Sequence, residues 1–285
     1  MTASPSPPFV DGLYRIAGEY DVLICDVWGV IHNGKEPFVA AIDALHRFRA
    51  DFGPVVLLSN APRLADGVKA QFARIGVPEN CYDAIVTSGM ATRTDLKHRS
   101  DRETPLAVYY LGPDRDLVAY EGLNLARVGV EQAELILCVG PVDDETETAE
   151  EYRGLLQRLR ARDLPMLCAN PDLVVQRGAK IVFCAGAIAR LYEEMGGEAI
   201  YFGKPHSNVF QAALSEARGF GPALRPLVIG DGVGTDILGA NRLGWDALFI
   251  VSGLHGDVGD SPERVRDLFI KHRIHARAAM VGLAW

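Results

Sequence analysis

Four short polar segments of this sequence could together carry out phosphoryl transfer, and each of them follows an apolar run. Ligands of an open α/β sheet bind beyond the carboxyl ends of the strands, where the loops meet. A carboxylate nucleophile with metal-binding carboxylates and phosphate-binding donors is the set of groups needed for transfer through an aspartyl intermediate. The segments are Asp26-Val27-Trp28, Ser59-Asn60, Gly203-Lys204-Pro205, and Gly230-Asp231 with Asp236.

Each of these residue types has a physical role in such a reaction. Asp26 can attack phosphorus, and its oxygens with those of Asp231 are the hard ligands that Mg²⁺ prefers. Ser59 can donate a hydrogen bond to a phosphoryl oxygen, and Lys204 offers a compact positive charge to the transition state. Asp236 would hold Lys204 or the waters around the metal. Any one of these residues alone would be unremarkable at a turn or a helix start.

The elements that must position these residues follow a strand–helix alternation. Continuously apolar strands alternating with helices are typical of a parallel sheet covered on both faces, so we expect an α/β fold. Helices are expected near residues 38–48, 64–75, 150–162, 207–218 and 236–243, and from residue 261. The expected strands are Tyr20–Cys25, Pro54–Leu58, Ala84–Val86, Leu106–Tyr110, Leu135–Val139, Met166–Ala169, Ala199–Phe202, Pro226–Ile229 and Ala247–Val251.

At these motifs the sequence resembles the haloacid dehalogenase (HAD) superfamily, whose four motifs occur in the same order. It is most similar to the NagD-like, or p-nitrophenyl-phosphatase-like, branch (subclass IIA). Further matches to this branch are the segment at residues 87–92 and Ala169-Asn170-Pro171-Asp172. The resemblance covers about residues 20–253. It implies a Rossmann-like parallel-sheet core at residues 1–89 and 199–285, with an α/β cap domain of type two inserted at 90–198.

The resemblance also implies a role for each matching position. Asp26 corresponds to the nucleophile, and Mg²⁺ would be bound by Asp26, Asp231 and the main-chain carbonyl oxygen of Trp28. Ser59, Asn60 and Lys204 would bind the phosphoryl group, with Asp236 supporting them. Two residues of the cap, Asn170 and Asp172, are expected to face the site. The implied partner is a small phosphorylated substrate, and family caps often pair into homodimers.

The sequence departs from the family at Trp28, where phosphatases of the family have a second Asp as general acid and base. The indole offers only an N–H donor that does not ionise usefully. A positioned acid or base contributes about 10²–10⁴-fold to the rate, so we expect slow hydrolysis of ordinary phosphate esters. Residues i and i+2 of an extended segment face the same way, so the indole should border Asp26. His32 or His206 could carry the proton in its place.

Three functions remain open at this point. The first is a Mg²⁺-dependent phosphatase that forms an aspartyl-phosphate on Asp26 and acts on a small phosphorylated metabolite. The second is a phosphate-ligand-binding or regulatory protein that has kept the scaffold. The third is cleavage of a carbon–phosphorus or carbon–halogen bond, although Asp231 and Asp236 favour a metal and count against metal-free dehalogenation.

Composition limits the partners and the compartment. A net charge of −8 over 285 residues gives no electrostatic footprint for nucleic acid or an anionic membrane, and no run is apolar for long enough to span a bilayer. An acidic protein that handles an anionic substrate needs local positive charge or a metal. Five cysteines without a Cys-x-x-Cys pair indicate free thiols in a reducing compartment. With no signal-peptide pattern at the start, we expect a cytoplasmic protein.

Overall fold

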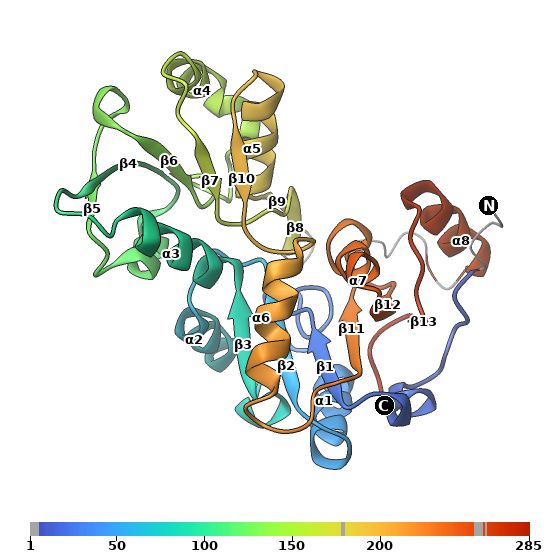
Figure 1. Ribbon diagram of the computed structural model, residues 1–285. Coiled ribbons are helices and arrows are strands. Elements are labelled where there is room, and N and C mark those ends of the chain that lie inside the picture. The colour runs from blue at the N-terminus through green and yellow to red at the C-terminus, as the bar shows by residue number, and fades with distance from the viewer. Residues whose placement is uncertain (1–5, 178–179, 254–258, 260) are drawn as a thin grey trace.

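The protein consists of two parallel sheets, each covered by helices, and one antiparallel hairpin (Figure 1). The structure is a computed structural model that describes residues 6–177, 180–253, 259 and 261–285. The larger sheet has the strand order β13-β12-β11-β1-β2-β3, and the second has the order β10-β7-β6-β4-β5. All neighbouring strands within both sheets are parallel. The expected α/β class is therefore confirmed.

The larger sheet is buried on both faces, as its apolar strands require. Alternate residues of each strand enter two hydrophobic clusters. Helices α1 (Val39–Asp51) and α2 (Ala65–Ile75) pack on one face, whereas α6 (Ser207–Ala217), α7 (Leu238–Leu243) and α8 (Pro262–His272) pack on the other. The strands are β1 (Val22–Cys25), β2 (Val55–Ser59), β3 (Ala84–Thr87), β11 (Pro226–Gly230), β12 (Asp246–Ile250) and β13 (Ala278–Met280).

The second sheet has its own core and lies to one side of the first in Figure 1. Helices α4 (Arg153–Arg160) and α5 (Ala185–Glu194) cover one face, and Leu96 of α3 (Ser88–Arg99) enters the cluster on the other. Its strands are β4 (Leu106–Leu111), β5 (Leu125–Arg127), β6 (Leu135–Cys138), β7 (Met166–Cys168) and β10 (Ala199–Tyr201). The hairpin of β8 (Val174–Arg177) and β9 (Lys180–Phe183) lies at the junction of the two sheets.

The pairing of β10 corrects one expected boundary. The sequence placed residues 199–285 in the core, but β10 pairs with β7 of the second sheet, and Phe202 N–H donates to the Cys168 carbonyl at 3.0 Å. The strand belongs there because the second sheet's hydrophobic cluster continues onto its partly buried residues. The returning segment therefore enters the core only after this strand. The other limits, at residues 1–89 and 90–198, stay predictions.

Most of the expected elements occur within a few residues of their predicted bounds, and the local signals at their ends explain this. Gly76 ends α2 in the left-handed conformation, with φ of +84°. The hydroxyl of Ser261 caps α8. The helix expected from Asp236 begins differently, because a π-helical turn at Val233–Ile237 precedes α7. Short elements with weak apolar patterns, such as β5, β13 and the hairpin, were not predicted.

Two expectations from composition have structural counterparts. The five cysteines are free and buried. Among the described residues, no helix is both long enough and apolar enough to cross a membrane.

Candidate functional site

A cavity of about 640 Å³ lies between the carboxyl ends of the core strands and the loops of the second sheet. It is lined by residues of both parts, which is the arrangement expected of a capped site. Apart from the two alternative proton carriers, His32 and His206, every residue that the sequence predicted for the site lines this cavity except Asp236, which lies buried behind Lys204. The predicted residues on the lining are Asp26, Trp28, Ser59, Asn60, Asn170, Asp172, Lys204 and Asp231.

Three buried charges form a chain on the floor of the cavity. The Nζ of Lys204 donates to Oδ1 of Asp26 and lies 2.8 Å from Oδ1 of Asp236. The side chains of Lys204 and Asp236 are almost wholly buried, with 3% and 2% exposure. Burial lowers the pKa of Lys204, but the charges of Asp236, Asp26 and Asp172 raise it by more, so the net shift of the pKa is upward. Lys204 is therefore a fixed positive charge beside Asp26.

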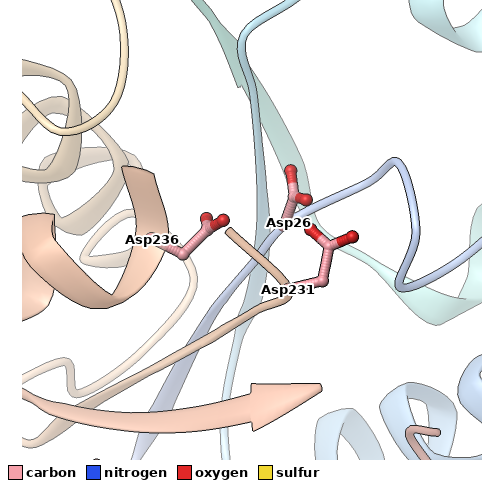
Figure 2. A group of neighbouring side chains, drawn as sticks. All are labelled: Asp26, Asp231 and Asp236. Carbon is pink, nitrogen blue, oxygen red and sulfur yellow. The ribbon is translucent and has the colours of Figure 1, made fainter. Parts of the chain in front are cut away.

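Asp231 completes a group of three carboxylates (Figure 2), in which Asp26 and Asp231 follow β1 and β11 and Asp236 comes from the π-helical turn. One oxygen from each of Asp26, Asp231 and Asp236 lies within 4.8 Å of the others. Asp231 is packed between two glycines, because a Cβ at either Gly29 or Gly253 would overlap its carboxylate. The close approach of these two backbones fixes the Asp231 side chain in the cavity wall.

The donor set fits a hard divalent cation. Burial raises the pKa of Asp26, and the charges of Asp236 and Asp231 raise it further, while Lys204 opposes them. Three close carboxylates and one ammonium leave this cluster with a net negative charge when all are ionised. Carboxylate oxygens at this spacing are the ligands that Mg²⁺ and Ca²⁺ take in proteins.

Ser59 ends β2 and Asn60 follows it, and their side chains make different contacts. The Ser59 hydroxyl accepts a bond from the N–H of Ala61 at 3.2 Å, so its own hydrogen remains available to a ligand. The Asn60 side chain instead binds protein at both ends. Its Nδ2 donates to Oδ1 of Asp172 at 2.8 Å, and its Oδ1 accepts from the N–H of Lys204 at 2.8 Å. We therefore propose that Asn60 positions Lys204 and Asp172, in place of the phosphate contact expected for it.

The two residues expected from the cap occupy one turn. Oδ1 of Asn170 accepts from the N–H of Asp172 at 3.0 Å, which holds the Asp172 carboxylate toward Asn60. Burial raises the pKa of Asp172, and Lys204 and Asn60 counteract this only in part. A second link joins the same segment to the core, because the Ser88 hydroxyl donates to the Ala169 carbonyl at 2.5 Å. The cap segment is thus tied to the loop after β2.

Trp28 lines the cavity together with Asp26, as its spacing predicted. Its indole packs against the hydrophobic core and lies edge to face with His32, with ring centroids 4.9 Å apart. Gly34 permits this packing, because a Cβ there would lie 2.5 Å from the indole. At the place where the family has an acidic side chain, the cavity therefore has a wall of fixed aromatic surface.

Neither histidine is placed to carry a proton in the cavity. His32 is fully buried between Trp28 and Phe72, and its Nδ1 accepts from the N–H of Gly34 at 2.9 Å. Burial lowers the pKa of His32 to about 4, so its imidazole is neutral near pH 7. His206 is exposed at the start of α6. The sequence could not exclude these residues, because burial and side-chain direction in a loop leave no periodic pattern.

Sequence reasoning missed a set of cavity-lining charges that belong mainly to the cap. Arg115 and Arg177 both bind Asp144, at 2.6 and 2.8 Å. Acidic stretches such as residues 143–151 usually form a solvated loop and a first helical turn, but the Asp144 side chain is only 14% exposed. No local signal marks these pairs, since their members come from three separate segments.

The fold and the site define a class of protein: an α/β protein with two parallel sheets, whose buried carboxylate cluster lies under a cap. Comparison with known proteins specifies the family. A model described as haloacid dehalogenase-like hydrolase matches residues 23–126, and a HAD-hydrolase-like model matches residues 201–272. A crystal structure of a haloacid dehalogenase-like hydrolase from Brucella suis 1330 is 41% identical, with a TM-score of 0.84, over 96% of this chain and all of that one. The protein therefore belongs to the haloacid dehalogenase-like hydrolases.

Two further relatives agree with the NagD-like branch. Ribonucleotide monophosphatase NagD from Escherichia coli K12 is 24% identical over 85% of this chain and 92% of its own length. A glycerol phosphate phosphatase from Mycobacterium tuberculosis has the same fold at 23% identity, with a TM-score of 0.63 over 87% of this chain and 74% of its own. Its structure was determined in complex with magnesium. The predicted membership of subclass IIA is confirmed.

Proposed function

We propose that this protein is a Mg²⁺-dependent phosphatase of a small phosphorylated metabolite, with Asp26 as the nucleophile. The observation that carries the proposal is the buried chain of Asp26, Lys204 and Asp236 beside Asp231 on the floor of a 640 Å³ cavity. The names of the relatives, a ribonucleotide monophosphatase and a glycerol phosphate phosphatase, support the same reaction class. The cavity is large enough for a metabolite and too small for a folded protein partner.

In the first step, an oxygen of Asp26 attacks phosphorus while the bond from phosphorus to the leaving oxygen breaks. Lys204 and the Ser59 hydroxyl bind the phosphoryl oxygens, and Asp236 keeps the ammonium in place at 2.8 Å. Asp26, Asp231 and the Trp28 carbonyl would bind the metal. When bound, a divalent cation supplies charge that offsets the repulsion between the carboxylates and an anionic phosphate.

In the second step, water attacks the phosphorus of the aspartyl-phosphate, and inorganic phosphate leaves as the Asp26 carboxylate is restored. The proton of the water passes to phosphate or to bulk solvent. Trp28 provides no base for this proton and no acid for the leaving group. Both steps therefore proceed without the family's usual proton carrier, which makes a stable leaving group important. Acyl phosphates and activated aryl phosphates meet that condition.

The experiment is a comparison of the wild type with Asp26→Asn on acetyl phosphate, p-nitrophenyl phosphate and glycerol 3-phosphate, with and without Mg²⁺. We expect Mg²⁺-dependent phosphate release that is fastest with acetyl phosphate, slowest with glycerol 3-phosphate and absent in the variant. Equal release by the two proteins would overturn the proposal. If neither protein hydrolyses any of these three substrates but phosphate still stabilises the fold, the protein is a phosphate-ligand binder.

A further inference from the structure

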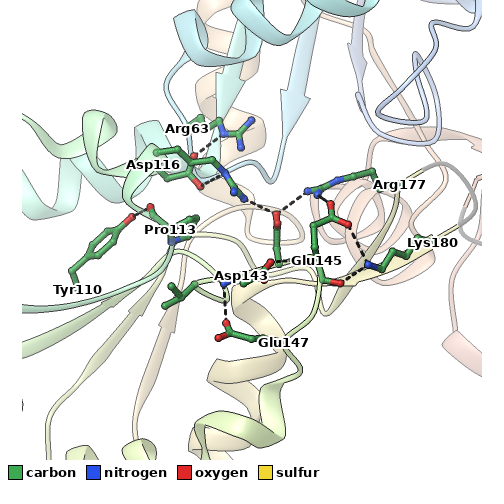
Figure 3. A network of polar contacts seen from close by, with 12 residues as sticks. Arg63, Tyr110, Pro113, Asp116, Asp143, Glu145, Glu147, Arg177 and Lys180 are labelled. Atoms are coloured by element: carbon green, nitrogen blue, oxygen red, sulfur yellow. Dashed lines mark hydrogen bonds and ion pairs between the residues drawn. The ribbon is translucent and has the colours of Figure 1, made fainter.

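A chain of ion pairs frames the cavity on the side of the cap (Figure 3). At one end, Arg63 of the core binds Asp116 at 2.7 Å. Arg115 then binds Asp144 at 2.6 Å, and Arg177 of β8 binds Asp144 at 2.8 Å. Glu145, outside the cavity lining, binds Arg177 at 2.6 Å and Lys180 at 3.2 Å. The chain thus runs from the core across the cap to the hairpin of β8 and β9.

Among the residues that line the cavity away from Lys204, arginines outnumber carboxylates. Apart from the carboxylates and ammonium around Lys204, the lining residues include four arginines, at positions 63, 74, 115 and 177. Only two carboxylates accompany them there, Asp116 and Asp144. Burial tends to raise the pKa of Asp144, but the hydrogen bond from Arg177 and the charges of both arginines lower it overall. Arg115 and Arg177 therefore share the ionised carboxylate of Asp144, and Arg177 has Glu145, outside the lining, as a second partner.

The position of Arg177 relates this charge to the reacting end of the cavity. A Cβ on Gly34 would lie 2.5 Å from the Trp28 indole and 3.4 Å from Cγ of Arg177. The aliphatic part of the Arg177 side chain thus lies beside the loop that supports Trp28. Trp28 in turn is two residues after Asp26. The Arg177 side chain is 28% exposed and that of Arg115 48%, so both can contact a ligand without losing Asp144. A guanidinium with free N–H groups matches a carboxylate or a second phosphate.

We propose that Arg177 and Arg115 form a second anion subsite, which selects substrates with another anionic group besides the phosphate that is removed. This inference rests on the proposed phosphatase function and specifies its substrate class as small phosphate monoesters that carry a second anionic group. A carboxylate or a distal phosphate would bind the two guanidinium groups while the reacting phosphate lies against Lys204. Asp144 holds both guanidinium groups in place when no substrate is bound.

The test compares aryl phosphates that differ mainly in the charge of one ring substituent, since the neutral amides have the slightly better leaving group. The probes are the 3- and 4-carboxyphenyl phosphates and their carbamoyl counterparts, in which an amide replaces the carboxylate. We expect kcat/KM to be roughly 10- to 100-fold higher for a carboxylate than for its matched amide, the size of one charge-assisted interaction. Arg177→Gln should lower the ratio of carboxylate to amide kcat/KM toward one. Arg190→Gln is the control, because Arg190 lies in the cap, binds Glu194 and does not line the cavity.

Binding measurements separate a failure of this inference from a failure of the phosphatase proposal. Carboxybenzylphosphonates and their carbamoyl analogues bind without turnover, so calorimetry reads the subsite even in an inactive protein. Tighter binding of the carboxylates to the wild type than to Arg177→Gln supports the subsite whether or not any ester is hydrolysed. Equal affinities for carboxylate and amide, in both the 3- and the 4-series, would overturn it. Circular dichroism of Arg177→Gln and Arg115→Gln establishes that the variants are folded.

Discussion

The imidazole of His32 lies edge to face with the indole of Trp28, with ring centroids 4.9 Å apart, and holds the indole in the cavity wall. His32 is itself fully buried and accepts a hydrogen bond from the N–H of Gly34. The residue that replaces the family's acid is therefore built into the loop that follows β1. This fixed position makes the effect of exchanging it predictable.

Trp28→Asp should restore acid catalysis to a site that otherwise retains its parts. We expect kcat for glycerol 3-phosphate to rise by about 10²–10⁴-fold, the usual contribution of a positioned acid. The gain for acetyl phosphate should be smaller, because its leaving group needs no proton and only the attack of water gains a base. Steady-state kinetics on both substrates measure this difference.

Loss of the indole should also reduce stability by about 2–4 kcal/mol, because a large side chain that packs on the core is removed. Trp28→Phe is the matched control, since it keeps an aromatic ring and adds no acid. A folded Trp28→Asp protein with no gain on glycerol 3-phosphate would show that the proton carrier is not the missing part.

Gly253→Ala should weaken metal binding. The added methyl group would overlap the Asp231 carboxylate and displace it from Asp26. We expect the Mg²⁺ concentration for half-maximal thermal stabilisation to rise by roughly tenfold, corresponding to about 1.4 kcal/mol. Gly234→Ala is the control, because a Cβ at Gly234 would meet no atom within 4 Å. Equal Mg²⁺ responses in the two variants would contradict the role given to Asp231.

Neither His32 nor His206 should contribute to the pH dependence of the reaction. His32 is fully buried, does not line the cavity and has a pKa lowered to about 4 by burial, so it stays neutral across the neutral range. His206 is exposed outside the cavity. His32→Asn and His206→Gln should therefore leave the shape of the kcat–pH profile between pH 5.5 and 8 unchanged, a range chosen about the ordinary histidine pKa. Loss of one limb of the profile in either variant would identify that residue as the proton carrier.

The cysteine thiols should be unreactive in the folded protein. Burial raises the pKa of Cys81 to about 11 and that of Cys138 to about 12, so the thiolate fraction at pH 8 is far below that of an exposed cysteine. All five thiols are also buried. Iodoacetamide at pH 8 should label none of them in the native state and all of them in guanidinium chloride, as peptide mass spectrometry can establish. Rapid labelling of a native thiol would show an open conformation.

Local sequence patterns were enough to predict the strands and the site residues at their carboxyl ends. The strand ends that carry Asp26, Ser59 and Asp231 follow continuous apolar runs, and the carboxyl ends of parallel strands meet at one edge. The position of the Trp28 indole beside Asp26 could also be predicted locally, since residues i and i+2 of an extended segment face the same way.

Contacts between distant segments could not be predicted. Asn60 donates a hydrogen bond to Asp172, 112 positions away, and this contact is the basis for the positioning role proposed for its amide. The pairing of Asp144 with Arg177 likewise depends on how a loop packs against a hairpin. The sheet to which β10 belongs is a third example, because three residues of apolar strand fit either sheet equally well.

The central claim is that Asp26 becomes phosphorylated, and it is tested most directly by trapping the phosphorylated enzyme. Because Trp28 offers no base to the attacking water, the aspartyl-phosphate should persist for long enough to be trapped. The wild type is mixed with acetyl phosphate and Mg²⁺, quenched in acid, digested and examined by mass spectrometry. We predict one phosphoryl group on the peptide that contains Asp26, and none on that peptide from Asp26→Asn. Continued release of phosphate with no phosphoryl group on that peptide at any time point would contradict the account.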